Sequence, residues 1–334
     1  MTLKKIGLGL ATGVVMAMST VAGNADGHGE LTVAYFLEWP TPNQFAQMEG
    51  LYEEALGMKV NFVSFDAGTA MSAAMASGDV HISFSQGIPP FVVAASAGQD
   101  LQVVDVAVSY SENDNCVARS SLEITKENAG ELAGKEVGVP LGTAAHYGFL
   151  KQMAHFGVDT STMKIVDMAP PDGAAAFANG NLDMVCGWGG SLRRMKEHGN
   201  TLLTGAEKEA LGIQVFDATT VSTQWAKENS ETLTKFLKVT ADMNAKFAGE
   251  SMGMMLPVVA KAAGMDEDAT KSTLAGFVFP TVEEQLSEKW LGGGTQAFLK
   301  EVADFFVEQG VIDSARPSYD DAVDASYLEA AAAM

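Results

Sequence analysis

Two stretches of this chain, AMASGDVHISFSQG (residues 74–87) and AFANGNLDMVCGWGG (residues 176–190), share one plan. In each, an alanine-rich helix pattern stops at a glycine, an acidic residue follows, and an apolar strand pattern ends in glycine. Two similar α/β lobes in one chain would produce this repetition, and so would two helices that merely end alike. The repetition favours a two-lobed α/β fold.

Strand and helix patterns alternate around both stretches. Strand patterns occupy residues 30–37, 59–65, 79–85, 101–110, 116–121, 135–140, 163–168, 182–188 and 201–205. Helix patterns lie between them at residues 41–57, 69–77, 145–156 and 173–178 and after Pro89-Pro90, and they dominate from about Thr223 onward. We expect Thr41 to cap the first helix and Pro42 to open it. This alternation predicts mostly parallel sheets covered by helices on both faces.

The first 25 residues predict a signal peptide. A lysine pair at positions 4–5 precedes an apolar run over residues 6–18, and Gly23 and Ala25 are small residues placed for cleavage after Ala25. The run is too short for a stable membrane span, and an uncleaved N-terminal anchor is the alternative. We therefore expect export to the periplasm.

The remaining chain is long enough for two lobes. We expect residues 26–112 to form the first part of lobe 1, residues 113–212 to form lobe 2, and residues 213–334 to return to lobe 1 and add C-terminal helices. Two open α/β lobes bind ligands between them, at the carboxyl ends of their strands. An exported protein of this shape has the outline of a solute receptor that closes around its ligand.

The composition argues against several functions. Aspartate and glutamate number 42 against 21 lysines and arginines, a net charge of −21, which argues against nucleic acid and anionic membranes as partners. The five histidines lack paired-ligand spacing, and no Walker, dinucleotide, Gly-x-Ser-x-Gly or His-Glu-x-x-His motif occurs. We therefore expect no metal, no cofactor and no catalytic residues.

The chain has two cysteines, Cys116 and Cys186. In an oxidising compartment a disulfide between them is favoured, and two separately buried thiols are the alternative.

The segment VPLGTAAHYGFL (residues 139–150) is a candidate anion site. A strand pattern ends at Pro140, Gly142 permits a tight turn, and Thr143 caps the helix that starts near Ala144. The first amides of a helix lack intrahelical partners and favour a carboxylate, phosphate or sulfonate. His146 and Tyr147, in the first turn, could donate to the same anion. An ordinary capped helix with a packing histidine is the alternative.

Further candidates lie at the ends of other strands. Glu38 and Trp39 follow the first strand, where a carboxylate beside an aromatic ring suits an ammonium group. Asp217 interrupts the apolar run IQVFDATTV and must be paired or face a ligand. The other candidates are Gln86, Gly87 and Trp188, all at strand ends. For Glu38, Trp39 and Trp188, solvation or core packing is the alternative.

The chain resembles periplasmic substrate-binding proteins of the taurine, aliphatic sulfonate and nitrate uptake family. The resemblance spans roughly residues 30–325 and rests on FDAGTAMSAAMASGDVHIS (65–83), GKEVGVPLGTAAHYGFLKQMAHFGVD (134–159) and APPDGAAAFANGNLDMVCGW (169–188). The strand followed by small hydroxyl residues and His-Tyr, with Pro-Pro one helix later, is typical of the taurine branch.

The resemblance implies the fold and the function. The fold would be a type II periplasmic-binding-protein fold, two α/β lobes joined by two crossover strands. The protein would be a monomer that captures taurine or a similar zwitterion and hands it to the membrane subunits of an ABC permease. The strand carrying Cys116 would lie beside the strand carrying Cys186, which supports the disulfide.

The resemblance also implies site roles. Thr143 and nearby amides would hold the sulfonate, with support from His146 and Tyr147. Trp188 would line the cleft, and Asp217 would pair with the amine.

This chain departs from the taurine branch at Ala144 and Ala145, where hydroxyl residues are usual, and at Glu38-Trp39. The ligand could therefore be a betaine-like or carboxylate zwitterion. A thiamine-pyrimidine-synthase-like enzyme on the same fold and a receptor that signals to a membrane sensor are further alternatives.

Overall fold

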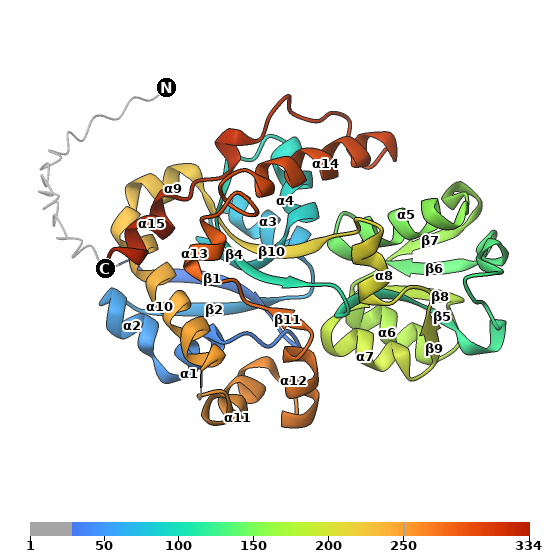
Figure 1. The fold of residues 1–334 in the computed structure, drawn as a ribbon, viewed down its shortest axis with the longest axis horizontal. Coiled ribbons are helices and arrows are strands. Elements are labelled where there is room, and N and C mark those ends of the chain that lie inside the picture. Colours follow the sequence, from blue (N-terminus) through green and yellow to red (C-terminus); the bar gives the residue numbers. More distant parts are fainter. Residues whose placement is uncertain (1–28, 250) are drawn as a thin grey trace, which may run out of the picture.

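In a computed structural model, which describes residues 29–249 and 251–334, the chain forms two α/β lobes, each built on its own sheet (Figure 1). The predicted signal peptide lies outside the described residues. In the described part, no helix is both long and apolar enough to span a bilayer.

Lobe 1 is built on a six-stranded sheet. Its strands, in spatial order, are β11 (Phe277–Val278), β4 (Leu101–Tyr110), β10 (Val215–Ser222), β3 (Ile82–Gly87), β1 (Leu31–Phe36) and β2 (Val60–Phe65). Its helices are α1 (Asn43–Glu49), α2 (Leu51–Leu56), α3 (Gly68–Ser77), α4 (Ile88–Ser96), α9 (Thr223–Glu228), α10 (Ser230–Ala248), α11 (Met252–Ala263), α12 (Glu267–Leu274), α13 (Val282–Gln285), α14 (Gly294–Glu308) and α15 (Ser326–Ala332). Helices cover both faces of this sheet (Figure 1).

Lobe 2 is built on a five-stranded sheet. Its strands, in spatial order, are β7 (Lys164–Asp167), β6 (Glu136–Val139), β8 (Met184–Trp188), β5 (Asp114–Arg119) and β9 (Gly199–Thr201). Helix α5 (Ala144–Phe156) lies on one face, and α6 (Pro170–Ala178) and α7 (Gly189–Lys196) lie on the other; α8 (Gly205–Ala210) leads back toward lobe 1 (Figure 1). These elements fall within residues 113–212, and the lobe boundaries stay a prediction.

The two-lobed α/β fold is confirmed, and the structure refines the strand directions. Strands β1, β2 and β3 are parallel neighbours, as are β7, β6 and β8. Each sheet also holds a strand that follows a crossing between the lobes and runs antiparallel to its neighbours: β10 between β3 and β4, and β5 between β8 and β9. Both sheets are therefore mixed, because a chain that enters a sheet from the other lobe arrives from the opposite direction.

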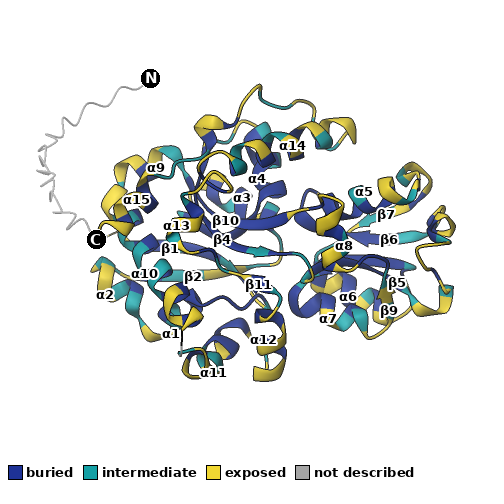
Figure 2. Cartoon of the chain, in the orientation of Figure 1, coloured by how far each residue is buried: buried dark blue, intermediate teal, exposed yellow. Residues whose placement is uncertain are grey.

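The apolar strand patterns correspond to the core. Every residue of β3 is buried, as are all but one in β4, so these strands are covered on both faces (Figure 2). Such strands give continuous apolar runs rather than alternation.

Two local predictions need correction. The helix expected over residues 41–57 is divided at Gly50, whose φ of +70° ends α1, and the first residue of that helix is Asn43 rather than Pro42. The strand expected at 201–205 is β9, shifted toward the N-terminus, because Thr204 caps α8 with its hydroxyl.

Candidate functional site

A cavity lies between the lobes at the carboxyl ends of four strands. Its empty volume, which includes space open to solvent, is about 290 Å³. Lobe 1 contributes Phe36, Trp39, Gly68, Gly87, Pro90, Tyr110 and Asp217, and lobe 2 contributes Thr143, Ala144 and Trp188. The cavity is therefore complete only when both lobes are present.

Asp217 places a buried carboxylate at one side of this cavity. The residue is 2% exposed; its Oδ1 accepts a hydrogen bond from the Tyr110 hydroxyl (2.6 Å) and its Oδ2 accepts one from the Ser85 hydroxyl (2.7 Å). Burial raises the pKa of Asp217 to about 7, although these hydrogen bonds oppose the rise. None of the ion pairs within the described residues involves Asp217. A cation in the cavity would be its natural partner.

Aromatic side chains hold this carboxylate in place. The Trp39 indole N–H donates to the Ser85 hydroxyl at 3.2 Å, and the Trp39 ring meets Tyr110 nearly edge-on, with centroids 4.8 Å apart. Ser85 itself has a φ of +62°, a backbone conformation that costs energy for a non-glycine residue and is common at functional sites. Rigid neighbours therefore fix the direction of the Asp217 oxygens.

The start of α5 supplies hydrogen-bond donors from the other lobe. Thr143 is the N-cap: its hydroxyl donates to the Pro140 carbonyl (2.6 Å) and accepts from the His146 amide (3.4 Å). Within the described residues, no acceptor is found for the amides of Ala144 and Ala145. Free amides at a helix N-terminus favour an anion.

Gly87 lies between these two groups. A Cβ placed on Gly87 would be 3.4 Å from Asp217 Oδ1 and 3.7 Å from the Ala144 Cβ. The carboxylate and the helix start therefore converge on the same small space. A ligand with a cation and an anion on a short chain can reach both.

Six predicted residues line the cavity and five do not. Trp39, Gly87, Thr143, Ala144, Trp188 and Asp217 line it, whereas Glu38, Gln86, Gly142, His146 and Tyr147 do not.

Glu38 does not line this cavity and is paired within the protein. Its carboxylate accepts hydrogen bonds from both terminal nitrogens of Arg194 (Nη2 to Oε2, 2.9 Å) and from the Ser191 hydroxyl (3.3 Å). Arg194 belongs to lobe 2, so this ion pair joins the two lobes.

Gln86 is fully buried and satisfied by protein groups. Its side-chain amide donates to the Gly68 carbonyl (2.8 Å) and the Ser72 hydroxyl (2.6 Å), and its oxygen accepts from the Thr220 hydroxyl (2.9 Å). It supports the cavity wall from behind.

The polar groups at the first turn of α5 are likewise used within the protein. The Gly142 amide donates to His146 Nδ1 at 3.1 Å, and burial lowers the pKa of His146 to about 4, so this ring is neutral at pH 7. The Tyr147 hydroxyl donates to Glu301 at 3.2 Å. Packing roles, the alternative considered for His146, account for both side chains.

The sequence left several lining residues unnoticed. Tyr110 ends a predicted strand and Phe36 is one residue from the end of another, and those positions could have identified them. Gly68 and Pro90 carried no such signal. Asp114, at the start of β5, is a second buried carboxylate near Asp217, whose pKa it raises further.

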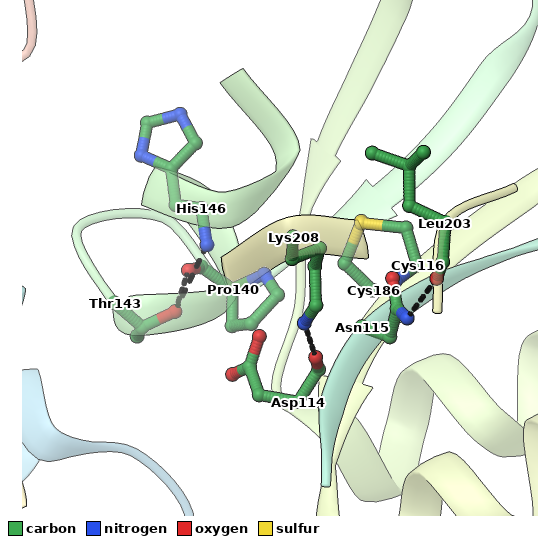
Figure 3. The surroundings of a disulfide bond; sticks show 9 residues. All are labelled: Asp114, Asn115, Cys116, Pro140, Thr143, His146, Cys186, Leu203 and Lys208. Carbon is green, nitrogen blue, oxygen red and sulfur yellow. Dashed lines mark hydrogen bonds between the residues drawn. A yellow bond between two sulfur atoms is a disulfide. The ribbon is translucent and has the colours of Figure 1, made fainter. Parts of the chain in front are cut away.

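Asp114 has few protein partners. In the described part of the chain, its Oδ2 is buried without a hydrogen-bond partner. Burial raises its pKa to about 6 against the opposing charge of Lys208, whose amine donates to the Asp114 carbonyl oxygen. Figure 3 shows the carboxylate on the side facing Thr143 and Pro140, at the start of α5.

Cys116 and Cys186 form a disulfide, which confirms their pairing (Figure 3). They face each other across β5 and β8, with Cα atoms 3.9 Å apart. The bond therefore joins the strand that begins at Asp114 to the strand that ends at Trp188. Among the residues the structure describes, no cluster of three or more His, Cys, Asp or Glu side chains could hold a metal ion.

The chain is similar in sequence and in fold to known proteins. The chain is 25% identical over 304 residues to the taurine-binding periplasmic protein of Escherichia coli (strain K12), an alignment that covers 90% of this chain and 92% of that protein. The fold is similar to that of the alkanesulfonate-binding protein SsuA from Xanthomonas axonopodis pv. citri, solved bound to MOPS, with a TM-score of 0.69, 19% identity and coverage of 85% and 94%.

The same fold also occurs in an enzyme. The desulfurization enzyme DSZB superposes with a TM-score of 0.63 at 15% identity, over 91% of this chain and 99% of that one. A family profile described as "NMT1/THI5 like" matches residues 41–250, most of the described chain. On that match, the chain belongs to the NMT1/THI5-like family.

Proposed function

We propose that this protein is a periplasmic receptor that binds a small amino sulfonate, taurine or a close relative, between its lobes. The observation that carries the proposal is the pairing, in one small cavity, of a buried carboxylate with free helix amides. Asp217 would hold the ammonium group, and the amides of Ala144 and Ala145 would hold the sulfonate. The methylene groups would lie against Trp39 and Trp188.

The charge balance of the cavity supports a zwitterion. Among residues 29–249 and 251–334, Asp217 forms no ion pair with a basic side chain, and burying its charge without one is costly. The helix amides bring partial positive charge without a cationic side chain, which suits a single anionic group. A ligand carrying both charges satisfies both ends.

The likeness to the taurine-binding protein of E. coli supports the substrate class and the periplasmic location. By the same reasoning, the bound receptor would act as a monomer that delivers its ligand to the membrane subunits of an ABC permease. We propose a binding function rather than catalysis, because both cysteines are held in a disulfide and the chain is similar over most of its length to a protein named as taurine-binding.

Isothermal titration with a matched ligand set tests the proposal. Taurine should bind with one site per chain, ethanesulfonate should bind much more weakly because it lacks the ammonium group, and β-alanine should measure the preference for sulfonate over carboxylate. Glycine betaine, which offers no N–H donors to Asp217, should also be weak. Tighter binding of betaine than of taurine would favour the betaine-type receptor, and absence of binding by any of these ligands would overturn the proposal.

A further inference from the structure

We propose that Phe36 and Trp188 form an aromatic partition that limits the length of the ligand and separates the cavity from a larger outer compartment. This inference rests on the proposed function for its choice of probes. Phe36 and Trp188 would then decide which sulfonates fit between the lobes.

The partition consists of one side chain from each lobe. Phe36 ends β1 and Trp188 ends β8, and their ring centroids lie 5.9 Å apart with the planes at 60°. Both rings line the inner cavity, and both also line a second space with an empty volume of about 730 Å³. The two spaces therefore share this pair of rings as a wall.

The outer compartment suits an apolar group. Of its three charged side chains, Glu38 and Arg194 pair with each other, and Asp66 is exposed to solvent. The Ser191 hydroxyl donates to Glu38. Phe65, Pro170 and Pro171 supply apolar surface. A ring or alkyl group extending from a small sulfonate would meet that surface if the partition were removed.

Glycines on both sides of Trp188 hold the partition in place. A Cβ on Gly189 would lie 2.4 Å from the Glu38 carbonyl oxygen, and one on Gly187 would lie 2.9 Å from Met195 Cε. The Gly190 amide donates to the Glu38 carbonyl at 3.2 Å. The end of β8 is thus pressed against the main chain of lobe 1, two residues beyond Phe36, and this contact fixes the backbone that carries the indole.

The test compares taurine with two larger sulfonates, N-cyclohexyltaurine and hexanesulfonate, by isothermal titration on the wild-type protein and on Trp188→Ala. In the wild type, N-cyclohexyltaurine should bind at least about 100-fold more weakly than taurine, because overfilling a packed cavity is costly. For the same reason, hexanesulfonate should bind more weakly than ethanesulfonate, which also lacks an ammonium group. In Trp188→Ala, at least one of the two larger sulfonates should bind about tenfold or more tighter than in the wild type, because its ring or chain gains apolar burial. The taurine affinity should fall by less than this gain.

Controls separate the partition from general effects of losing a tryptophan. Trp225→Ala removes another partly buried tryptophan, which lines a different hollow with His81, and it should leave all affinities unchanged. Phe36→Leu removes less of the partition and replaces Trp188→Ala in the test if Trp188→Ala does not unfold in a cooperative thermal transition.

The outcomes distinguish the two proposals. If the wild type binds taurine and the larger sulfonates with equal affinity, the partition is overturned and the receptor function stands. The same holds if neither Trp188→Ala nor Phe36→Leu binds the larger sulfonates more tightly than the wild type does. If the wild type binds no taurine but an opened variant gains a larger sulfonate, the partition stands and the taurine assignment falls.

Discussion

Replacing Asp217 with asparagine should weaken taurine binding and remove its dependence on pH. Asparagine keeps the size of the side chain but loses the charge that would pair with the ammonium group. Loss of one partner of a buried charge pair costs about 2 kcal/mol or more, which is about 30-fold in affinity. The variant also loses one acceptor for the hydroxyls of Tyr110 and Ser85.

The pH dependence follows from the raised pKa of Asp217. In the ligand-free protein this pKa is about 7, and an ammonium ligand binds the ionised form. Affinity should therefore be full above pH 7 and fall as the pH drops, by about tenfold per unit between pH 7 and pH 5. Taurine itself does not titrate in this range, so the slope reports on the protein.

The assay is isothermal titration of taurine at pH 5, 6, 7 and 8 with the wild type and Asp217→Asn. The wild type should show the slope, and the variant should bind weakly at every pH. Ethanesulfonate, which carries no amine, should not weaken as the pH falls. A flat wild-type profile, or a variant with wild-type affinity, would refute the assignment of Asp217 to the ammonium group.

Four further predictions concern the same site and the fold around it. Gly87→Ala should weaken taurine binding at least about tenfold in a titration, because the new methyl group enters the space for the ligand. The melting temperature should stay unchanged, because that methyl group meets protein atoms only at ordinary contact distances of 3.4 Å or more. An unchanged taurine affinity would place the ligand elsewhere. Asp114→Asn should shift the fall in taurine affinity to lower pH, because the Asp114 charge helps to raise the pKa of Asp217; an unshifted profile would separate the two carboxylates. In urea unfolding, the stability of Asp217→Asn relative to wild type should rise by about 3 kcal/mol between pH 5 and pH 8. The reason is that a carboxyl whose folded pKa is raised from 3.8 to about 7 costs the wild type stability as the pH rises through that window. A constant difference would contradict the raised pKa. Replacing Cys116 and Cys186 with alanine should cost about 4 kcal/mol for a bond that spans 70 residues, and thiol titration of the denatured, unreduced wild type should find no free thiols; two reactive thiols would disprove the bond.

Sequence patterns located the strand ends well, and residues at the strand ends line the cavity between the lobes. Gly87 and Trp188 were found because apolar runs ended at them, and Thr143 and Ala144 because a turn and a cap mark the start of a helix. Asp217 was found because a carboxylate inside an apolar run must have a partner. Each of these signals depends only on residues that are close together in the chain, so it can be recognised without the tertiary structure.

The same reasoning does not find partners that lie far along the chain. Glu38 pairs with Arg194, 156 residues away, and Gln86 bonds Thr220, 134 residues away. Tyr147 bonds Glu301, 154 residues away. The sequence around these residues does not indicate such distant partners, so each was predicted to contact a ligand.

The sequence by itself determined the two α/β lobes, the strand ends that could form a site and the residues able to carry opposite charges, because period, caps and glycine stops depend on neighbours in the chain. Only the tertiary structure decided which of those charges remain free. Whether a buried polar group can serve a ligand depends on whether the protein already satisfies it, and for Asp217, Asp114 and Glu38 that depends on side chains brought together by the packing of two lobes.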